Sequence, residues 1–277
     1  MSILCCPVCR SPLQRLDKLY RCPKGHSFDR AAKGYVNLLL SHEMNSKTPG
    51  DSPEMVRART AFLDGGYYSC LRRGLADLCL KLLGQNGQKT PSVIDTGCGE
   101  GYYTLGIYET LCQSGFSPKM AGIDLSKAAL KHASGRCREI EYAIASLFHL
   151  PAADGSVQLI TDVFAPVAPQ EFARVLAPGG YVVVAAPGVD HLWGMKQVVY
   201  QNPYANDDLP PEMPGFTLVE KMEVNDNIVV PHQRIPDLFA MTPYFWKSPR
   251  EGTAKLMELE ELKTPISFSL FVFQKNS

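Results

Sequence analysis

The most constraining feature of this chain is a glycine-rich loop that begins with an acidic residue. Residues 95–101 are Asp-Thr-Gly-Cys-Gly-Glu-Gly, after a short apolar run and before a segment with helical spacing. Glycine lets the backbone turn sharply from a strand into a helix and pass close beneath a ligand. The loop therefore predicts a ligand site at the carboxyl end of the first strand of a sheet.

Apolar runs of strand length alternate with helical segments through most of the chain. We expect strands at residues 93–95, 120–124, 140–145, 157–162, 181–186, 216–224 and 266–273. Helical spacing predicts helices at residues 55–63, 71–83, 102–112, 127–137, 169–176, 191–200 and 255–262. Alternation of this kind indicates an α/β fold whose central strands are parallel and joined by right-handed crossovers.

A second acidic residue, Asp124, ends the strand expected at 120–124. A carboxylate at this place can accept hydrogen bonds from both ribose hydroxyls of a nucleoside. The competing interpretation is a nucleotide-binding dehydrogenase, but Asp95 would then lie beside phosphate. The acidic loop and Asp124 together resemble class I S-adenosylmethionine-dependent methyltransferases. This resemblance implies a Rossmann-like domain, S-adenosylmethionine as the cofactor, and cofactor contacts from Asp95, Gly97, Gly99, Glu100, Gly101 and Asp124.

The N-terminal cysteines have the spacing of a metal site. Cys6 and Cys9 form a Cys-x-x-Cys pair, and a Cys-x-x-x-His pair, Cys22 and His26, follows. This spacing suits a tetrahedral zinc ion, and four protein ligands give the metal a structural role. Cys5 is the alternative to Cys6, but Cys6 gives the two-residue spacer. The pattern predicts a zinc ribbon, with redox-active or chance thiols as the alternative.

The charge of the chain is unevenly distributed. The whole sequence has 28 basic and 28 acidic residues, yet residues 1–36 hold seven Lys and Arg against two Asp. The N-terminal segment is thus +5 and the remainder −5, which favours a polyanionic partner for the ribbon. A solvated basic face without a partner is the alternative. The longest apolar runs are only strand-length and no leader follows Met1, so we expect neither a membrane span nor secretion.

Composition divides the chain into three parts. Residues 1–36 form the predicted zinc-ribbon module, whose basic charge suits a polyanion such as RNA and predicts an RNA-recognition role. Residues 37–91 contain a polar, turn-rich linker at 37–53 and a helical segment. Residues 92–277 form the predicted methyltransferase domain.

Several connecting segments are more discriminating than the glycine loop. They include Lys-Gly-Tyr-Val-Asn-Leu-Leu at 33–39, Gly-Asp-Ser-Pro-Glu-Met at 50–55, Phe-Ala-Pro at 164–166 and Met-Thr-Pro at 241–243. With the zinc ribbon, they resemble the 23S ribosomal RNA (guanine-N1)-methyltransferase family over nearly the whole chain. The resemblance implies a cytoplasmic homodimer that methylates N1 of a guanine in a hairpin of 23S rRNA. It also implies cofactor contacts from Tyr68 and His191.

Methylation of guanine N1 requires loss of the proton that N1 carries at neutral pH. Asp162, at the end of the strand expected at 157–162, is the candidate catalytic base, with Glu100 and His191 as alternatives. Two other functions remain open. A small-molecule methyltransferase would give no reason for the basic zinc ribbon, whereas a non-catalytic RNA-binding factor would have no use for the intact loop and Asp124.

Overall fold

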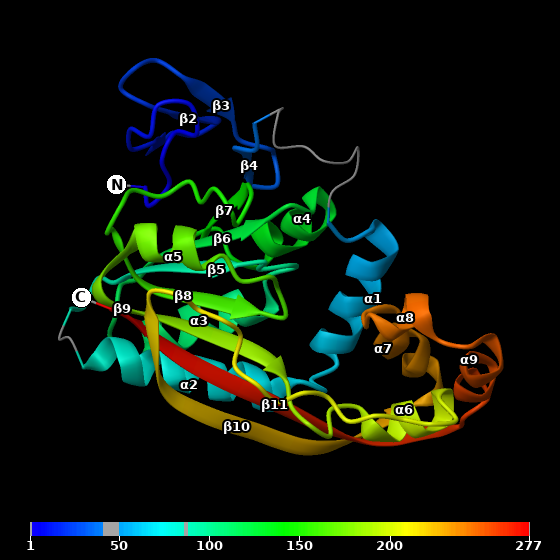
Figure 1. The fold of residues 1–277 in the computed structure, drawn as a ribbon. Coiled ribbons are helices and arrows are strands. Elements are labelled where there is room, and N and C mark those ends of the chain that lie inside the picture. Colours follow the sequence, from blue (N-terminus) through cyan, green and yellow to red (C-terminus); the bar gives the residue numbers. More distant parts are fainter. Residues whose placement is uncertain (1, 41–49, 86–87, 277) are drawn as a thin grey trace.

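The computed structural model describes residues 2–40, 50–85 and 88–276 of the chain (Figure 1). Its strands are β1 (Gln14–Arg15), β2 (Leu19–Arg21), β3 (Ser27–Asp29), β4 (Val36–Asn37), β5 (Ser92–Thr96), β6 (Lys119–Asp124), β7 (Glu141–Ile144), β8 (Val157–Val163), β9 (Leu176–Pro187), β10 (Phe216–Pro231) and β11 (Glu261–Lys275). Its α-helices are α1 (Pro53–Asp64), α2 (Ser69–Gly84), α3 (Tyr102–Gln113), α4 (Lys127–Arg136), α5 (Pro169–Val175), α6 (Trp193–Val199), α7 (Ile235–Ala240), α8 (Tyr244–Lys247) and α9 (Arg250–Met257). A 3-10 turn, η2, covers His232–Arg234.

The central sheet is largely parallel, as predicted. Its strand order is β10-β11-β9-β8-β5-β6-β7-β4. The strands from β9 to β4 pair in parallel, whereas β11 is antiparallel to both β9 and β10. The first strand of the α/β unit, β5, therefore lies in the middle of the sheet, and its carboxyl end opens on a point where the chain order reverses.

Alternate side chains of the central strands enter two separate cores. On β5, Val93 packs with residues of α2, α3 and α4, whereas Ile94 packs with α5 and the zinc ribbon. Leu159 and Ile160 of β8 divide in the same way. Since successive strand residues face opposite sides of a sheet, helices cover one face and the ribbon with α5 covers the other.

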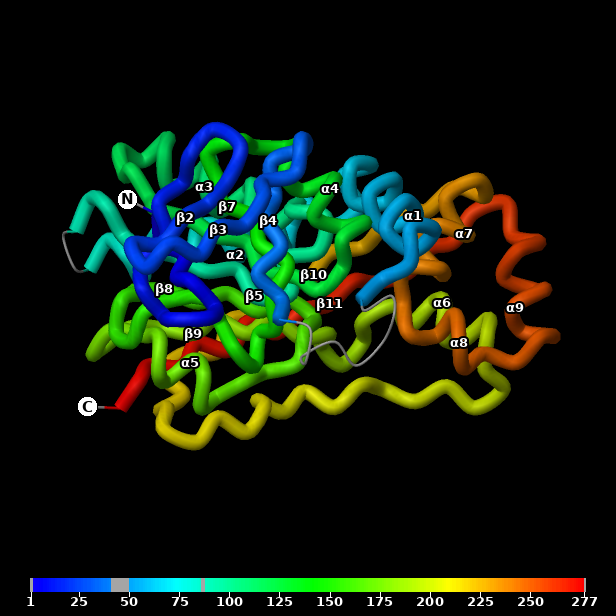
Figure 2. The backbone as a smooth tube through the Cα atoms, turned by 90° about the horizontal axis from the view of Figure 1, so that it is seen from above, coloured from blue at the N-terminus to red at the C-terminus, as the bar shows by residue number. Residues whose placement is uncertain are grey.

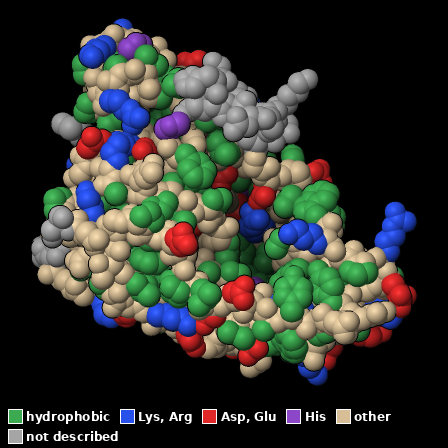
Figure 3. Space-filling model, viewed as in Figure 1, with side chains coloured by type: hydrophobic (Ala, Val, Ile, Leu, Met, Phe, Trp, Pro, Cys, Tyr) green, Lys and Arg blue, Asp and Glu red, His purple; other side chains and the backbone are tan. Residues whose placement is uncertain are grey.

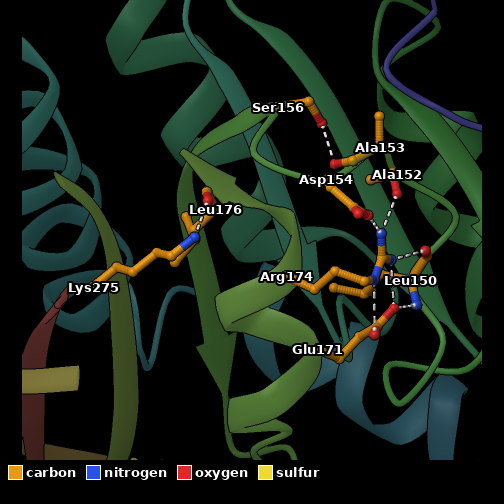
Figure 4. Close-up of polar contacts among 9 residues, drawn as sticks. All are labelled: Leu150, Ala152, Ala153, Asp154, Ser156, Glu171, Arg174, Leu176 and Lys275. Atoms are coloured by element: carbon orange, nitrogen blue, oxygen red, sulfur yellow. Dashed lines mark hydrogen bonds and ion pairs between the residues drawn. The ribbon is translucent and has the colours of Figure 1, made fainter. Parts of the chain in front are cut away.

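The zinc ribbon is joined to the sheet by hydrogen bonds as well as by apolar packing. Cys5 N–H donates to the carbonyl of Pro151 at 2.6 Å, and the ribbon continues into β4, which pairs with β7. Figure 4 shows how the loop that receives Cys5 is held. Arg174 donates to the carbonyls of Leu150 and Ala152, each at 2.9 Å, and Glu171 accepts from Leu150 N–H at 2.7 Å. These hydrogen bonds therefore fix the loop to which the ribbon is bonded.

A second group of elements faces the carboxyl ends of the strands. In Figure 1, α1 stands between the sheet and α7, α8 and α9. Figure 2 shows the segment between α6 and β10 running extended along one side of the molecule. Lys196 fixes this segment through the Tyr204 carbonyl at 3.0 Å and Asn206 Oδ1 at 2.6 Å. This arrangement encloses space beside the glycine loop.

Several predicted boundaries are wrong. Strand β9 begins at Leu176 and not at residue 181, and β11 begins at Glu261 and not at residue 266. The helix expected over 255–262 ends at Met257, because Leu262 pairs with Val230 across the β10–β11 hairpin and the chain is extended from Glu261. The same pairing carries β10 to Pro231, well past residue 224. Residues 41–49 of the predicted linker lie outside the described residues, and the three-part division at residues 36 and 91 remains a prediction. Within the described chain, no helix has the length and apolarity needed to cross a membrane.

Candidate functional site

The four predicted metal ligands meet at one point of the ribbon. The ligand atoms of Cys6, Cys9, Cys22 and His26 all lie within 4.8 Å of one another. The Sγ atoms of Cys9 and Cys22 are 3.6 Å apart, and His26 Nδ1 lies 3.4 Å from Cys22 Sγ. A zinc ion with ordinary bonds to sulfur and nitrogen separates its tetrahedral ligands by about 3.5–3.8 Å. The donor set therefore fits a structural zinc ion.

The N-terminal thiols differ in their surroundings. Hydrogen bonds from Ser11 lower the pKa of Cys9 to about 6, whereas burial raises the pKa of Cys6 to about 11. Cys5 lies outside the four-residue cluster and is buried against the Pro151 loop. The cluster thus contains Cys6, the member of the Cys5–Cys6 pair that the two-residue spacer favours, and its role as a ligand stays a prediction.

A cavity of about 700 Å³ opens at the carboxyl ends of β5, β6 and β8. Figure 3 shows the corresponding hollow between the sheet and the α6–α9 group, with hydrophobic side chains inside it. Each predicted cofactor residue lines this cavity except Gly101, which lies at the start of α3. Its lining contains Tyr68, Asp95, Gly97, Gly99, Glu100, Asp124 and His191.

Two glycines of the loop have backbone dihedral angles that other residues adopt only with strain. Gly97 and Gly101 have φ of 64° and 85°, in the left-handed region. A Cβ on Gly97 would come within 2.4 Å of Ala165 Cβ, and one on Gly101 within 2.9 Å of Ala133 Cβ. The loop can therefore lie against the neighbouring elements and leave room for a ligand above it only with glycine at these positions.

Asp95 and Asp162 belong to one buried network beneath the loop. Asp95 accepts hydrogen bonds from Thr161 at 2.7 Å and Thr104 at 2.5 Å, and burial raises its pKa to about 6. Thr96 Oγ1 lies 3.0 Å from Asp162 Oδ2, and Ala165 N–H donates to Asp162 Oδ1 at 3.3 Å. Burial raises the pKa of Asp162 to about 8. The network ties β5 to β8 and to the segment that follows β8.

This placement does not support Asp162 as the catalytic base. Its side chain is fully buried, and it is absent from the cavity lining, which passes from Val163 to Phe164 above it. A general base must come within hydrogen-bond reach of the proton that it removes. We therefore infer that Asp162 positions residues 163–166 and does not act as the catalytic base.

The two alternative bases are also engaged. Glu100 binds Arg136 through two nitrogens, at 2.5 and 2.8 Å, although burial still raises its pKa above the ordinary value. His191 Nδ1 accepts from Ser267 N–H at 3.3 Å, so its proton is assigned to Nε2, which lies 3.2 Å from Tyr68 Oη. Burial lowers the pKa of His191 to about 3, which keeps the ring neutral.

Tyr68 and His191 are distant in sequence but adjacent in the cavity wall. Both rings pack on Phe268, with centroids 4.9 and 4.7 Å from its ring. Because His191 donates to the Tyr68 hydroxyl, the hydroxyl proton is free to point toward a ligand. The structure thus brings together the two residues for which only the family resemblance implied cofactor contacts, and those contacts stay a prediction.

Asp124 presents both carboxylate oxygens at the edge of the site. Oδ1 accepts from Ser126 N–H at 2.7 Å and Oδ2 from Gly99 N–H at 2.8 Å. Burial raises the pKa of Asp124, and these two N–H groups oppose the shift. Each oxygen keeps a second acceptor direction, which suits the two hydroxyls of a ribose.

Comparisons with known proteins agree with this geometry. The segment at 4–47 matches the zinc-ribbon family described as RlmA, N-terminal, and residues 93–180 match a methyltransferase domain. A 23S rRNA (guanine(748)-N(1))-methyltransferase of Streptomyces fradiae is 30% identical over 96% of this chain and 95% of its own length. The chain belongs to the 23S rRNA (guanine-N1)-methyltransferase family.

Two further matches support the assignment. A candidate member of this family from Micromonospora griseorubida is 34% identical over 68% of this chain and 66% of its own length. A solved structure, a candidate type II methyltransferase from Anaeromyxobacter dehalogenans, covers 74% of this chain and 95% of its own, with a TM-score of 0.50 and 16% identity. The predicted family, class I fold, S-adenosylmethionine cofactor and structural zinc are therefore confirmed.

Sequence reasoning assigned no role to an ion pair inside the cavity. Arg59 of α1 contacts the Asp51 carboxylate, and the Asp51 carbonyl accepts from Ser126 Oγ at 2.9 Å. These contacts place the start of α1 above the Asp124 loop. A single arginine in a helix gives no local signal of a site, because its position depends on how α1 packs against the sheet edge.

Proposed function

We propose that this protein transfers the methyl group of S-adenosylmethionine to N1 of a guanine in a hairpin of 23S rRNA. The observation that carries the proposal is the composition of the cavity lining, which combines the acidic loop with apolar and aromatic side chains. Next to the acidic loop that suits the cofactor, the lining is apolar and aromatic, with Phe164, Pro166, Pro187, Leu192, Met241, Pro243, Tyr244 and Trp246. A flat nucleobase would fit against the apolar and aromatic side chains, next to a methyl donor bound at the acidic loop.

Phe164 and Trp246 are the aromatic groups best placed for a base. Their side chains are 46% and 72% exposed although both line the cavity. Phe164 also has φ of 58°, a backbone state that costs about 1–3 kcal/mol and that functional sites often retain. Since N1 lies on the Watson–Crick edge, a paired guanine would have to leave its helix before it could stack on these rings.

The ribbon supports RNA as the substrate. Arg10, Lys18, Arg21, Lys24 and Lys33 are exposed, and none of the seven ribbon cations forms an ion pair with a described carboxylate. Figure 3 shows Lys and Arg side chains on the ribbon, at the upper left of the view. Unpaired cations on one module are suited to phosphates and supply sequence-independent affinity.

The chemistry requires a methyl donor and the loss of one proton from N1 for each methyl group transferred. S-adenosylmethionine would supply an activated methyl group and leave as S-adenosylhomocysteine, and the N1 proton would pass to solvent. Since Asp162, Glu100 and His191 are buried or already engaged, we propose that the protein accelerates transfer mainly by holding N1 in line with the sulfonium. Tyr68 and Asp124 would fix the cofactor, and Phe164 would fix the base.

Labelled methyl transfer tests this proposal. The purified protein is incubated with S-adenosylmethionine that carries a labelled methyl group. The acceptor is either total RNA that lacks 1-methylguanosine in 23S rRNA or a small-molecule extract. We expect the label in 23S rRNA as 1-methylguanosine. Label in a small molecule, or none in either fraction, would instead support one of the two alternative functions. The family resemblance also leads us to propose a cytoplasmic homodimer, which sedimentation at RNA-binding concentrations would test.

A further inference from the structure

One corner of the cavity contains a cation among acids. Four carboxylates line the cavity (Asp51, Asp95, Glu100 and Asp124), and Arg59 is the one Lys or Arg in its described lining. The Arg59 side chain is 27% exposed. Its guanidinium lies against the glycine loop: a Cβ added to Gly99 would be 3.8 Å from Arg59 Nη1. This corner is where the amino-acid end of S-adenosylmethionine would lie.

A buried hydroxyl without a partner opens on the same cavity. Tyr103, the second residue of α3, lines the cavity, and its Oη is buried with no hydrogen-bond partner among the described residues. Burial raises its pKa well above the ordinary value, with Arg59 partly offsetting the shift, so the group is a neutral donor. A buried hydroxyl left unpaired costs about 1–3 kcal/mol, which an acceptor on a ligand would recover.

The charges of the cofactor determine which part of it belongs here. S-adenosylmethionine carries a sulfonium, an ammonium and a carboxylate. The four cavity carboxylates attract its two cations and repel its carboxylate, so the carboxylate needs a cationic partner. Arginine has five N–H donors in a planar fork suited to carboxylates, and the contact with Asp51 uses only part of that fork.

We propose that Arg59 and Tyr103 bind the α-carboxylate of S-adenosylmethionine. Asp51 holds the guanidinium over the glycine loop, and Tyr103 donates its hydroxyl proton from the first turn of α3. The inference depends on the proposed methyl-transfer function only in its choice of ligand. It makes these two residues the part of the site that distinguishes the cofactor from nucleosides without a carboxylate.

Paired ligands isolate this contact. Decarboxylated S-adenosylmethionine keeps the adenosine, the sulfonium and the amine but lacks the carboxylate. We measure the affinity of the full chain for both ligands by isothermal titration calorimetry in the absence of RNA. A charge-assisted contact predicts that the wild type prefers the intact cofactor by about tenfold to a hundredfold.

Variants then assign the preference to residues. Arg59→Met should lower the preference to within about threefold, by weakening only the intact cofactor, and Tyr103→Phe should reduce it by about three- to tenfold. Arg57→Met is the matched control, because Arg57 lies on the same helix, pairs with exposed Glu54 and is absent from the cavity lining. This control should leave both affinities unchanged.

Three results would overturn the inference: no preference in the wild type, an unchanged preference in Arg59→Met, or equal loss of both ligands in that variant. If Arg59→Met does not fold by circular dichroism, Tyr103→Phe and Arg59→Lys provide the same test through the same ratio. Because no RNA is present, failure here is distinct from failure to methylate 23S rRNA.

Discussion

The Asp124→Asn substitution tests how the cofactor is held. Asp124 uses one acceptor direction of each oxygen for the Ser126 and Gly99 N–H groups, which leaves one direction on each for the ribose. Asparagine keeps one oxygen and replaces the other with an NH₂ group. That group would face a backbone N–H, so the substitution both removes a ribose acceptor and disturbs the loop.

The size of the effect follows from these contacts. A hydrogen bond to a charged group contributes about 1.5–3 kcal/mol, and loss of the charge weakens both ribose bonds. We expect a total loss of about 3–4 kcal/mol, which is roughly a hundredfold to a thousandfold in the dissociation constant. A larger effect would indicate that the glycine loop has also moved.

Calorimetric titration with S-adenosylhomocysteine measures this loss directly. Asp77→Asn is the control, because Asp77 is an exposed residue of α2 outside the cavity. Thermal unfolding establishes that both variants are folded. An affinity of Asp124→Asn within threefold of the wild type, at an unchanged unfolding temperature, would refute the assignment of Asp124 to the ribose.

Three other predictions address the zinc site, the stacking of the guanine on Phe164, and the buried carboxyl of Asp162. Cys22→Ser should reduce the zinc content, measured by elemental analysis, to near zero and weaken RNA binding more than S-adenosylhomocysteine binding; equal losses would count against the ribbon as an RNA module. Phe164→Ala should lower kcat/KM for RNA about tenfold to a hundredfold without changing cofactor affinity. Phe148 is 55% exposed and lies outside the cavity, so the control Phe148→Ala should leave kcat/KM unchanged. Equal losses of kcat/KM in the two variants would contradict the stacking role of Phe164. The Asp162 carboxyl, with a pKa near 8 against 3.8 unfolded, binds a proton only in the folded state between those values, so its share of the stability is lost as pH rises through 8. Asp162→Asn should remove this loss in denaturant titrations at pH 5, 7 and 9 and retain methyl transfer, whereas an inactive but folded variant would restore Asp162 as the base.

Local sequence patterns predicted the parts of the structure that depend on local spacing. The zinc ligands are set by two turns, and their spacing alone identified Cys6, Cys9, Cys22 and His26. The glycine loop and its helix also depend on neighbouring residues. The central strands were found because their apolar runs are buried on both faces, as parallel strands usually are.

Contacts between distant segments were beyond the reach of these patterns. The end of strand β8 gave no sign that Asp162 would be covered by the segment after it, because burial depends on the packing of residues 163–166. Arg59 reaches the glycine loop only through the position of α1. Tyr68 and His191, 123 positions apart, were found through family resemblance and not through residue spacing.

The central claim concerns one atom of one RNA. Mass mapping of 23S rRNA from a strain in which the gene for this chain is deleted, compared with its parent, tests it most directly. The map reads every guanine of the hairpin, including the one equivalent to position 748 named for the Streptomyces fradiae relative. The account predicts that a single 1-methylguanosine disappears from the hairpin on deletion and returns when the gene is restored. Identical maps from the deletion strain and a parent that expresses the protein would contradict it.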